Sequence, residues 1–487
     1  MQQLHRAQPS QRPLRVLQFG GGNFLRGFFD WYVDILNETQ GLNADVLVLR
    51  STAGNDAPLL DTQGGVYTTL VRGLNEAGAP VKQFRQIQCV RGEVDLRKDF
   101  DAFIASAHEP ALRFIVSNTT EAGIAANEVD AYEDRPPASF PAKLTRWLHE
   151  RYRAFNGQPD KGVYVLPCEL IDDNGPALKR CVLHFAQRWN LEPGFTDWLD
   201  RSCFFCSTLV DRIVPGHPAA EMAALENELG YRDPFLVAAE YFNLFVIQGP
   251  AALAQELKLQ HSGLHINLVE DIKPFKLRKV GILNGGHTLL VPIALLAGLE
   301  SVGAAMNDEL VTGFLVDALR EEVIPTLPLP ASELQSFAAD VLRRFSNPFI
   351  HHRLESIALN SWSKFAVRVM PQLLRYQEQE QALPKRLVLA LAATMHLYRG
   401  RAITLKDDSR HLEWFAGAWS HLEEGRWNWA DLAGRWLENA DLWGRDLSAV
   451  PGLVDALAAD LEAIEKNGIR RTLERSGALT TRTPALT

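Results

Sequence analysis

The sequence predicts an α/β N-terminal domain built on a parallel-rich sheet, followed by a mostly α-helical C-terminal domain. In the first 270 or so residues, short runs rich in β-branched and aromatic residues alternate with helical patterns, which is typical of a parallel sheet flanked by helices. From about Lys273 onward the pattern changes to long stretches of helical periodicity, such as "NDELVTGFLVDALREEVIPTL". We therefore expect two domains, residues 1–270 and residues 271–487.

Five runs in the first domain are candidate strands of the sheet. Each is a short, mainly apolar run with strand-forming residues, and helical or turn segments separate one run from the next. They are LRVLQFG (14–20), ADVLVLRS (44–51), LRFIVSN (112–118), GVYVLPC (162–168) and FFCSTLV (204–210).

The overall composition favours a protein that acts on a small molecule. The formal net charge of the 487 residues is −9 and there is no long basic run, so the electrostatic footprint of a nucleic-acid or anionic-membrane binder is missing. The first fifteen residues lack the apolar core of a signal peptide. The longest apolar runs, such as Leu289 to Leu299, are about half as long as a bilayer crossing requires. We expect a cytoplasmic protein; its oligomeric state is not readable from the sequence.

The cysteines and tryptophans are interpreted as packing residues. Cys203 and Cys206 form a C-x-x-C, but they lie in a strand-like run where residues three apart point to opposite faces, which argues against a metal or redox pair. Six of the eleven tryptophans fall between Trp414 and Trp443 on a helical background. Such a cluster can line a sugar site, but these spacings favour helix packing.

A glycine-rich turn follows the first predicted strand. Gly20, Gly21 and Gly22 stand between that strand and a predicted helix, where a dinucleotide-binding turn needs residues without a Cβ and free backbone N–H groups. The third glycine of the usual G-x-G-x-x-G would fall at Leu25, so the match is imperfect. The context predicts a Rossmann-type domain. Arg50 ends the second strand where an acidic ribose ligand is usual for NAD, and an arginine there could instead meet the 2′-phosphate of NADP.

Three polar residues interrupt the otherwise apolar segment "RKVGILNGGHT". An oxidoreductase needs a group that takes the hydroxyl proton and a donor for the developing alkoxide; a Tyr-x-x-x-Lys pair and a Cys and Gly-His-Glu zinc arrangement are both absent. On an α-helix, Lys279, Asn284 and His287 lie at about 0°, 140° and 80°, within one broad face. A lysine among apolar groups and other cations can act as general base, and an asparagine amide can donate to an oxyanion. Singly, each residue has a structural explanation, but the set favours a catalytic site.

With these residues, the chain resembles the polyol-specific long-chain dehydrogenases, the mannitol dehydrogenase family. The pattern Lys-x-x-x-x-Asn-x-x-His at 279, 284 and 287 is similar to the catalytic signature of that family. The resemblance covers most of the chain. Its other blocks are the glycine turn with Asn23 and Arg26, "GGVYTTLVRG" (64–73), "IVSNTTEAGI" (115–124), "STLVDRIVP" (207–215) and "SKFAVRVMPQLL" (363–374).

The resemblance implies metal-independent hydride transfer with NAD, a Rossmann-type N-terminal domain and a helical C-terminal domain. It implies that Lys279 is the acid and base, that Asn284 and His287 line the reacting carbon, and that Lys364 contacts substrate. Asp211 and Arg212 would lie near the same site. The residues that we expect to bind the cofactor are Gly20, Gly21, Gly22, Asn23, Phe24, Arg26, Arg50, Ser117, Thr119 and Glu121.

Several departures from the mannitol-type pattern indicate a different substrate. The asparagine that serves as a second oxyanion donor in mannitol dehydrogenases is here Leu170, so Asn284 would act alone or another group, such as Asn174, would replace it. An arginine is replaced by Ser356, and a glutamate that belongs to a proton channel is replaced by Lys276. Within the family, the sequence of these motifs is most similar to that of the branch that reduces keto sugar acids.

A sugar acid carries a carboxylate, which requires cations or N–H groups in the pocket. Lys364 and Arg368 are four residues apart on an expected helix and so face the same way, which makes them the first candidates. The segment "IHHR" (350–353) is the second candidate. Two alternatives remain open: a fructuronate-reducing or polyol-oxidising enzyme of the same family, and a dinucleotide-binding sensor without catalytic activity.

Overall fold

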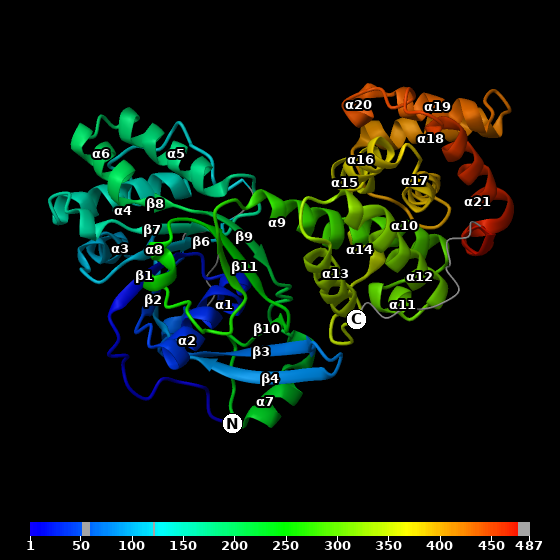
Figure 1. The fold of residues 1–487 in the computed structure, drawn as a ribbon. Coiled ribbons are helices and arrows are strands. Elements are labelled where there is room, and N and C mark those ends of the chain that lie inside the picture. Colours follow the sequence, from blue (N-terminus) through cyan, green and yellow to red (C-terminus); the bar gives the residue numbers. More distant parts are fainter. Residues whose placement is uncertain (51–58, 120–121, 476–487) are drawn as a thin grey trace. The chain divides into compact units, whose positions relative to one another are not determined.

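The computed structural model describes residues 1–50, 59–119 and 122–475. The chain divides into two compact units, one of Met1–Asn75 and Ala79–Ile272 and the other beginning its main part at Lys273. Figure 1 shows the first unit as strands with surrounding helices and the second as helices alone. The expectation of an α/β domain followed by a helical domain is therefore confirmed.

A six-stranded parallel sheet forms the centre of the first unit. Its strands run in the order β5-β2-β1-β6-β7-β8, and every neighbouring pair is parallel. The bounds are β1 (Leu14–Phe19), β2 (Asp45–Arg50), β5 (Val90–Asp95), β6 (Phe114–Ser117), β7 (Tyr164–Pro167) and β8 (Phe204–Phe205). Four of the five expected strands lie in this sheet over most of their predicted length.

The fifth expected strand, 204–210, is divided between two sheets. Phe204 and Phe205 pair with β7, whereas β9 (Ser207–Asp211) pairs antiparallel with β11 (Leu244–Gln248). The chain leaves the central sheet at Cys206, a change of partner that the local apolar pattern does not encode. The remaining strands are β3 (Tyr67–Leu74), β4 (Pro80–Ile87) and β10 (Val237–Glu240) in one small sheet, and β12 (Ile266–Val269) beside β11 in the other.

Side chains of the central strands alternate between two apolar clusters, as expected for a sheet covered on both faces. On β1, Val16 belongs to one cluster and Leu17 to the other. The two cysteines divide in the same way: Cys203 belongs to the second cluster and Cys206 to the first, which confirms that they point to opposite faces.

The helices of this unit are α1 (Asn23–Gly27), α2 (Phe29–Gln40), α3 (Phe100–Ala105), α4 (Phe140–Ala154), α5 (Asn174–Arg188), α6 (Pro193–Ser202), α7 (Met222–Leu229) and α8 (Ala252–Glu256).

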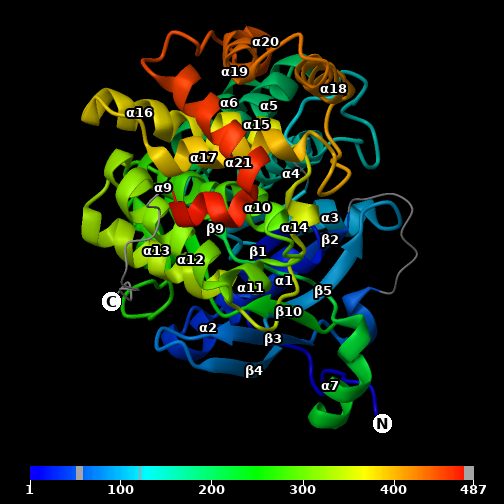
Figure 2. The ribbon, with the colours of Figure 1, turned by 90° about the vertical axis from the view of Figure 1, so that its right-hand side faces the viewer.

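The second unit is a helical domain around a fully buried helix, α17 (Lys385–Leu397), of which every residue from Arg386 to Leu397 is buried. It packs against both α10 and α21, as Figure 2 shows. The other elements are α9 (Lys273–Arg278), η5 (Lys279–Asn284), α10 (Gly285–Leu296), α11 (Val302–Met306), α12 (Glu309–Asp317), η6 (Ala318–Val323), α13 (Ala331–Phe345), α14 (Leu354–Ile357), α15 (Ser361–Arg368), α16 (Met370–Glu380), α18 (Ser409–Glu423), α19 (Trp429–Glu438), α20 (Ala440–Trp443) and α21 (Leu453–Arg475).

The tryptophan cluster packs helices together. Trp436 is fully buried, and its ring lies 4.9 Å from that of Trp362 and 5.6 Å from that of Trp443, measured between centroids. Trp419 is 3% exposed and lies against His396 of α17. These contacts confirm the packing interpretation for the central members of the cluster.

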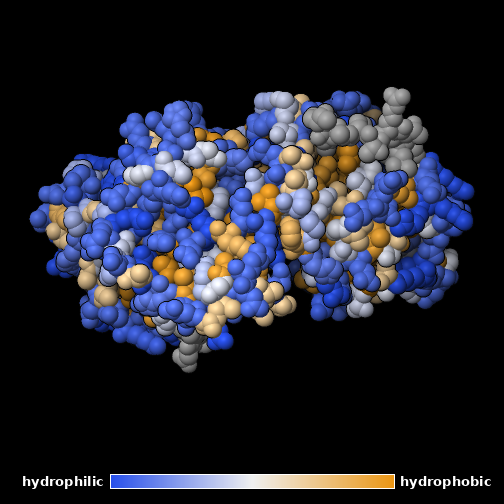
Figure 3. Space-filling model, turned by 90° about the horizontal axis from the view of Figure 1, so that it is seen from below, coloured by the Kyte–Doolittle hydropathy of each residue, from blue (hydrophilic) through white to orange (hydrophobic). Residues whose placement is uncertain are grey.

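The continuous helical segment Lys273–Leu296 is long and apolar enough to cross a membrane by length and composition alone. In this fold 67% of its most apolar stretch is buried inside the protein, so it serves as a core helix of the second unit. The face drawn in Figure 3 is mostly hydrophilic, with apolar side chains in small separate groups.

Candidate active site

The three glycines of the first turn are required for different reasons. Gly20 has a φ of +114°, in the region that favours glycine, and an added Cβ would lie 3.2 Å from the carbonyl oxygen of Asn118. At Gly21 a Cβ would lie 2.7 Å from Oε1 of Glu93. At Gly22 a Cβ would meet nothing within 4 Å. Internal packing therefore explains Gly20 and Gly21, whereas the open space at Gly22 suits the close approach of a ligand to the backbone.

The residues after the turn are held by contacts within the first unit. The guanidinium of Arg26 donates to Oδ1 of Asn23 (2.7 Å) and to the carbonyl oxygen of Phe235 (2.6 Å) and is almost fully buried. The ring of Phe24 stacks on that of Phe28, with the centroids 5.0 Å apart. Asn23 and Arg26 thus fix the start of α1, and their contact with a cofactor stays a prediction.

Arg50 is paired with a buried acid. Its Nε donates to Oε1 of Glu93 at 2.9 Å, and the other oxygen of Glu93 accepts from the backbone N–H of Leu60. The carboxylate offsets the positive charge that a 2′-phosphate would need. This contact favours NAD over NADP, an effect of Glu93 that could not be read from the position of Arg50 alone.

A buried glutamate ties the ends of β6 and β7 together. Glu169, two residues after the end of β7, accepts from Oγ of Ser117 (3.0 Å) and from the backbone N–H (3.0 Å) and Oγ1 (2.9 Å) of Thr119. The expected cofactor residues Ser117 and Thr119 are therefore fixed beside the glycine turn, because Ser117 also pairs with Phe19 of β1. Glu121, the third expected residue of this block, lies outside the described residues.

Asn174 does not replace the missing oxyanion donor. Its side-chain amide donates to the carbonyl oxygen of Pro167 (2.9 Å), and its Oδ1 accepts from the backbone N–H groups of Gly175 and Thr208, both at 2.9 Å. The side chain is buried and is used to join β7, α5 and β9. Leu170, by contrast, is 64% exposed, so the position that carries the second donor in mannitol dehydrogenases presents an apolar side chain at the surface of this unit.

Arg212 and Asp211 are buried at the end of β9. Arg212 donates to the carbonyl oxygens of Glu240 (2.9 Å) and Gly27 (2.8 Å), and its guanidinium lies 4.2 Å from the centroid of the Trp31 ring. Burial lowers the pKa of Arg212 to about 10. These contacts give Arg212 a structural role in the first unit, which the short motif "VDR" could not reveal. A contact of Arg212 with substrate stays a prediction.

Lys279 and Asn284 are the first and last residues of a π-helical segment, η5, and not part of the expected α-helix. A π-helix closes its hydrogen bonds over five residues, as between the N–H of Gly285 and the carbonyl of Val280. Each turn therefore takes up roughly one residue more than in an α-helix. Residues five apart then lie close to the same side, whereas α-helical geometry would separate them by about 140°. The π-helix thus brings Lys279 and Asn284 together better than the sequence predicts.

His287 follows on α10 and is neutral at physiological pH. Its ring stacks on Phe345, with centroids 4.0 Å apart and planes at 21°, and meets the ring of His352 edge-on at 5.3 Å. Burial, followed by the charges of His352, Arg344, Arg368 and Lys364, lowers the pKa of His287 well below its usual value. Its Nε2 is buried without a hydrogen-bond partner in the described part of the chain, so it is available to a substrate hydroxyl.

Lys364 and Arg368 lie on α15 in the neighbourhood of His287. Lys364 and His287 line the same small cavity, together with Thr288 and Ser361. Nζ of Lys364 donates to the carbonyl oxygen of Ile357 at 2.8 Å, and burial together with the charge of Arg368 lowers its pKa. Burial also lowers the pKa of Arg368. The structure thus brings together three of the residues that the sequence singled out, His287, Lys364 and Arg368.

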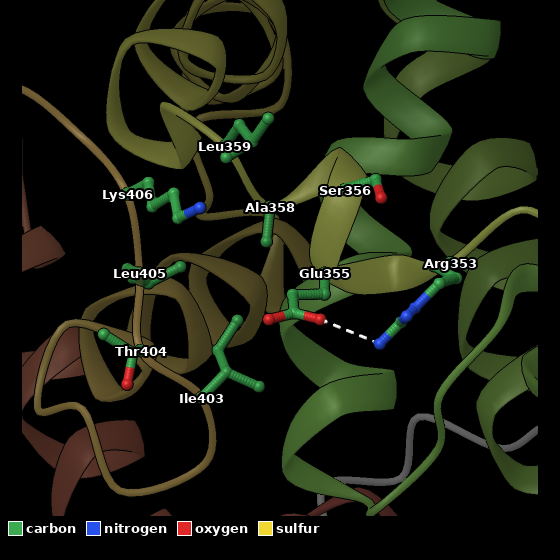
Figure 4. A pocket seen from close by; sticks show the side chains of 9 residues that line it. All are labelled: Arg353, Glu355, Ser356, Ala358, Leu359, Ile403, Thr404, Leu405 and Lys406. Carbon is green, nitrogen blue, oxygen red and sulfur yellow. Dashed lines mark hydrogen bonds and ion pairs between the residues drawn. The ribbon is translucent and has the colours of Figure 1, made fainter.

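A larger cavity of about 260 Å³ adjoins α14, as Figure 4 shows. Ser356, which stands where mannitol dehydrogenases have an arginine, contributes to its lining. Arg353, one turn earlier, forms an ion pair with Glu355 at 3.0 Å. The remaining lining residues are Ala358, Leu359, Ile403, Thr404, Leu405 and Lys406.

The C-x-x-C cysteines are poorly suited to thiolate chemistry. Burial raises the pKa of both Cys203 and Cys206 to about 12, which opposes formation of the reactive thiolate. Within residues 1–50, 59–119 and 122–475, no group of three or more His, Cys, Asp or Glu side chains is arranged to hold a metal ion.

Comparison with solved structures supports the fold at the level of both units. Mannitol 2-dehydrogenase of Pseudomonas fluorescens, solved as a ternary complex with NAD and D-mannitol, matches with a TM-score of 0.68 and 22% identity over 97% of this chain and 96% of its own. A D-sorbitol dehydrogenase in substrate-free form matches with a TM-score of 0.78 and 22% identity over 97% of each chain.

Sequence comparison identifies the family. An altronate oxidoreductase of Yersinia pestis is 51% identical over 94% of this chain and 96% of its own length, and that of Pectobacterium carotovorum is 50% identical over 95% and 97%. The family models "Mannitol dehydrogenase Rossmann domain" and "Mannitol dehydrogenase C-terminal domain" match residues 14–261 and 271–465. The chain therefore belongs to the mannitol dehydrogenase family of oxidoreductases.

Proposed function

We propose that this protein interconverts D-tagaturonate and D-altronate with NAD as the redox partner, as a tagaturonate reductase of the cytoplasm. The altronate oxidoreductases that are about half identical over nearly the whole chain support this assignment. The observation that carries it is the grouping in the second unit: a π-helix that aligns Lys279 with Asn284, followed by His287 among cationic side chains.

The first unit fits a dinucleotide. The positive φ at Gly20, the open space at Gly22 and the neutralisation of Arg50 by Glu93 suit NAD. The Pseudomonas fluorescens relative was solved with NAD, which supports the same cofactor here. When bound, NADH supplies the hydride that reduces the ketone carbon.

In the proposed mechanism, Lys279 donates a proton to the carbonyl oxygen as that carbon is reduced, and it takes the proton back in the oxidative direction. The amide of Asn284 donates a hydrogen bond to the same oxygen. Neutral His287 binds an adjacent hydroxyl through Nε2. Proton transfer by Lys279 and the hydrogen bond from Asn284 take the place of a Lewis-acid metal, so the reaction requires none.

The carboxylate of the sugar acid is assigned to Lys364 and Arg368. Arg368 makes no hydrogen bond or ion pair through its side chain with any described residue, and Lys364 uses only a backbone carbonyl. The charge of Asp407 acts on Lys364, whereas burial alone shifts the pKa of Arg368. A partly buried cation without an anionic partner, such as Arg368, is suited to a carboxylate ligand. A neutral polyol would leave the charge of Arg368 unpaired, which favours the sugar acid as substrate.

The test is NADH oxidation, followed by absorbance, with tagaturonate, fructuronate and fructose at equal concentrations. We expect the highest kcat/KM with tagaturonate. A preference for fructuronate or fructose would leave the chemistry intact and overturn the substrate assignment. No oxidation with any of the three, in a protein that still binds NADH, would favour the non-catalytic sensor.

A further inference from the structure

Four cationic or potentially cationic side chains surround His287. They are Arg344 of α13, His352 of the loop before α14, and Lys364 and Arg368 of α15, and each disfavours the charged form of His287. Arg344 has a further interaction within the protein, and the charge of Asp407 acts on Lys364. The side chain of Arg368 makes no hydrogen bond or ion pair with a described residue, so Arg368 is a partly buried cation that can still take an anion.

His352 is the member of this set whose role remains to be assigned. Its half-buried ring meets that of His287 at 79°, with centroids 5.3 Å apart. In the described residues its imidazole has no hydrogen bond or ion pair. The ring nitrogens are therefore available to a ligand beside His287.

The backbone holds His352 firmly in this place. Its carbonyl oxygen accepts from the N–H of Val302 at 2.9 Å, and the N–H of Leu354 donates to the carbonyl of Glu300 at 3.0 Å. Arg353 between them forms an antiparallel bridge with Ser301. A residue whose backbone is fixed on both sides, and whose side chain has no polar partner among the described residues, is suited to preorganised binding.

We propose that His352 binds the carboxylate of the sugar acid together with Arg368, and that it takes up a proton from solvent when it does so. This inference rests on the proposed function, because it specifies how the charged end of that substrate is held. It identifies His352 as a residue that distinguishes sugar acids from neutral sugars.

Proton uptake follows from the surroundings of His352. Burial lowers the pKa of its imidazole, so the free enzyme holds it neutral near pH 7. Neutral His287 lies beside it, the charges of Arg344, Lys364 and Arg368 act on His287, and the carboxylate of Asp407 acts on Lys364. A carboxylate bound next to His352 favours the imidazolium and raises its pKa. Substrate binding therefore weakens as the pH rises above that value.

The first test is steady-state kinetics of His352→Asn, with His261→Asn as the control. His261 is an exposed histidine of the first unit. We expect His352→Asn to raise KM for tagaturonate about tenfold or more, as for loss of a charge-assisted hydrogen bond, and to change kcat much less. His261→Asn should keep both constants. An unchanged KM in His352→Asn would overturn the inference.

The second test measures the uptake of protons when ligand binds. Altronate is titrated into the NADH-loaded enzyme, in which no turnover can occur, by calorimetry at pH 7.5 in phosphate and in Tris, whose ionisation enthalpies differ. The wild type and His261→Asn should take up a proton on binding, and His352→Asn should not. Equal uptake in His352→Asn would refute the role of His352. A wild type that fails to reduce tagaturonate would instead refute the proposed function, so the two failures are distinguishable.

Discussion

At the scale of single residues, Lys279 carries the proposed chemistry, and its removal should separate catalysis from cofactor binding. We expect Lys279→Ala to lower kcat by about 10²- to 10⁴-fold, the usual contribution of a general acid and base. NADH affinity should be nearly unchanged, since the expected cofactor residues lie in the first unit. Stopped-flow NADH oxidation and NADH fluorescence measure the two effects. Lys273→Ala, an exposed lysine at the start of α9, is the control, and normal turnover of Lys279→Ala would refute the mechanism.

Asp30, on α2 behind the glycine turn, is an acid whose complete burial favours its neutral form. Oη of Tyr67 lies 2.8 Å from Oδ2 of Asp30 and 3.0 Å from the carbonyl oxygen of Arg26, yet a phenol has one proton for these two acceptors. If Asp30 is protonated, it donates to Tyr67, and Tyr67 donates to Arg26. Burial raises the pKa of Asp30 to about 7, against the hydrogen bonds of Tyr67 and Gln18 and the charge of Arg26, which lower it.

This pKa predicts a stability that falls with rising pH. The unfolded chain releases the Asp30 proton near pH 4 and the native protein near pH 7, so the contribution of Asp30 is greatest below pH 4 and declines between these values. The size of the decline is on the order of 4 kcal/mol. Because asparagine does not titrate, the Asp30→Asn variant should lack this decline in stability. Denaturant unfolding at pH 5 and pH 8 should show a larger gain for the variant at pH 8; a gain that is equal at both pH values would argue against a neutral Asp30.

At the scale of secondary-structure elements, the ends of β6 and β7 depend on Glu169. Glu169→Ala removes the acceptor of Ser117 and Thr119, and each hydrogen bond to a charged group contributes about 1.5–3 kcal/mol. The segment beside Gly20 should loosen, and NADH affinity should fall roughly tenfold or more. NADH fluorescence titration measures this loss. Glu133→Gln, at an exposed position, is the control. Wild-type affinity in Glu169→Ala would show that the hydrogen bonds of Glu169 with Ser117 and Thr119 do not support cofactor binding.

The sequence reveals elements whose signal is local and misses those that depend on distant contacts. Period-2 and period-3.6 patterns locate β1, β2, β6, β7 and the helices of the second unit, because burial of one face determines those patterns. The π-helix that begins at Lys279 has no periodic pattern of its own in the sequence. The angles of an α-helix therefore place Asn284 about 140° away from Lys279, farther than in a π-helix. The roles of Glu169, Asn174 and Arg212 depend on partners 28 to 185 residues away, which only the fold brings together.

At the scale of the whole molecule, the proposed roles divide between the two units. Every residue that we expect to bind the cofactor precedes Ile272, and every residue of the proposed reacting trio follows Lys273. Both large apolar clusters around the central sheet also consist of residues from the first unit. Cofactor binding should therefore be a property of the first unit, and turnover a property of the complete chain.

A fragment of residues 1–272 tests this division. Because its sheet is covered on both faces by its own helices, we expect it to fold and to bind NADH with an affinity within about tenfold of the complete chain. At 100 times its Kd, NADH should stabilise the fragment by about 2.7 kcal/mol, which a thermal-shift measurement detects. The fragment should not reduce tagaturonate. If it gives the circular dichroism of a folded α/β protein but binds no NADH, the cofactor site requires residues of the second unit, and the assignment of cofactor binding to the first unit alone is wrong.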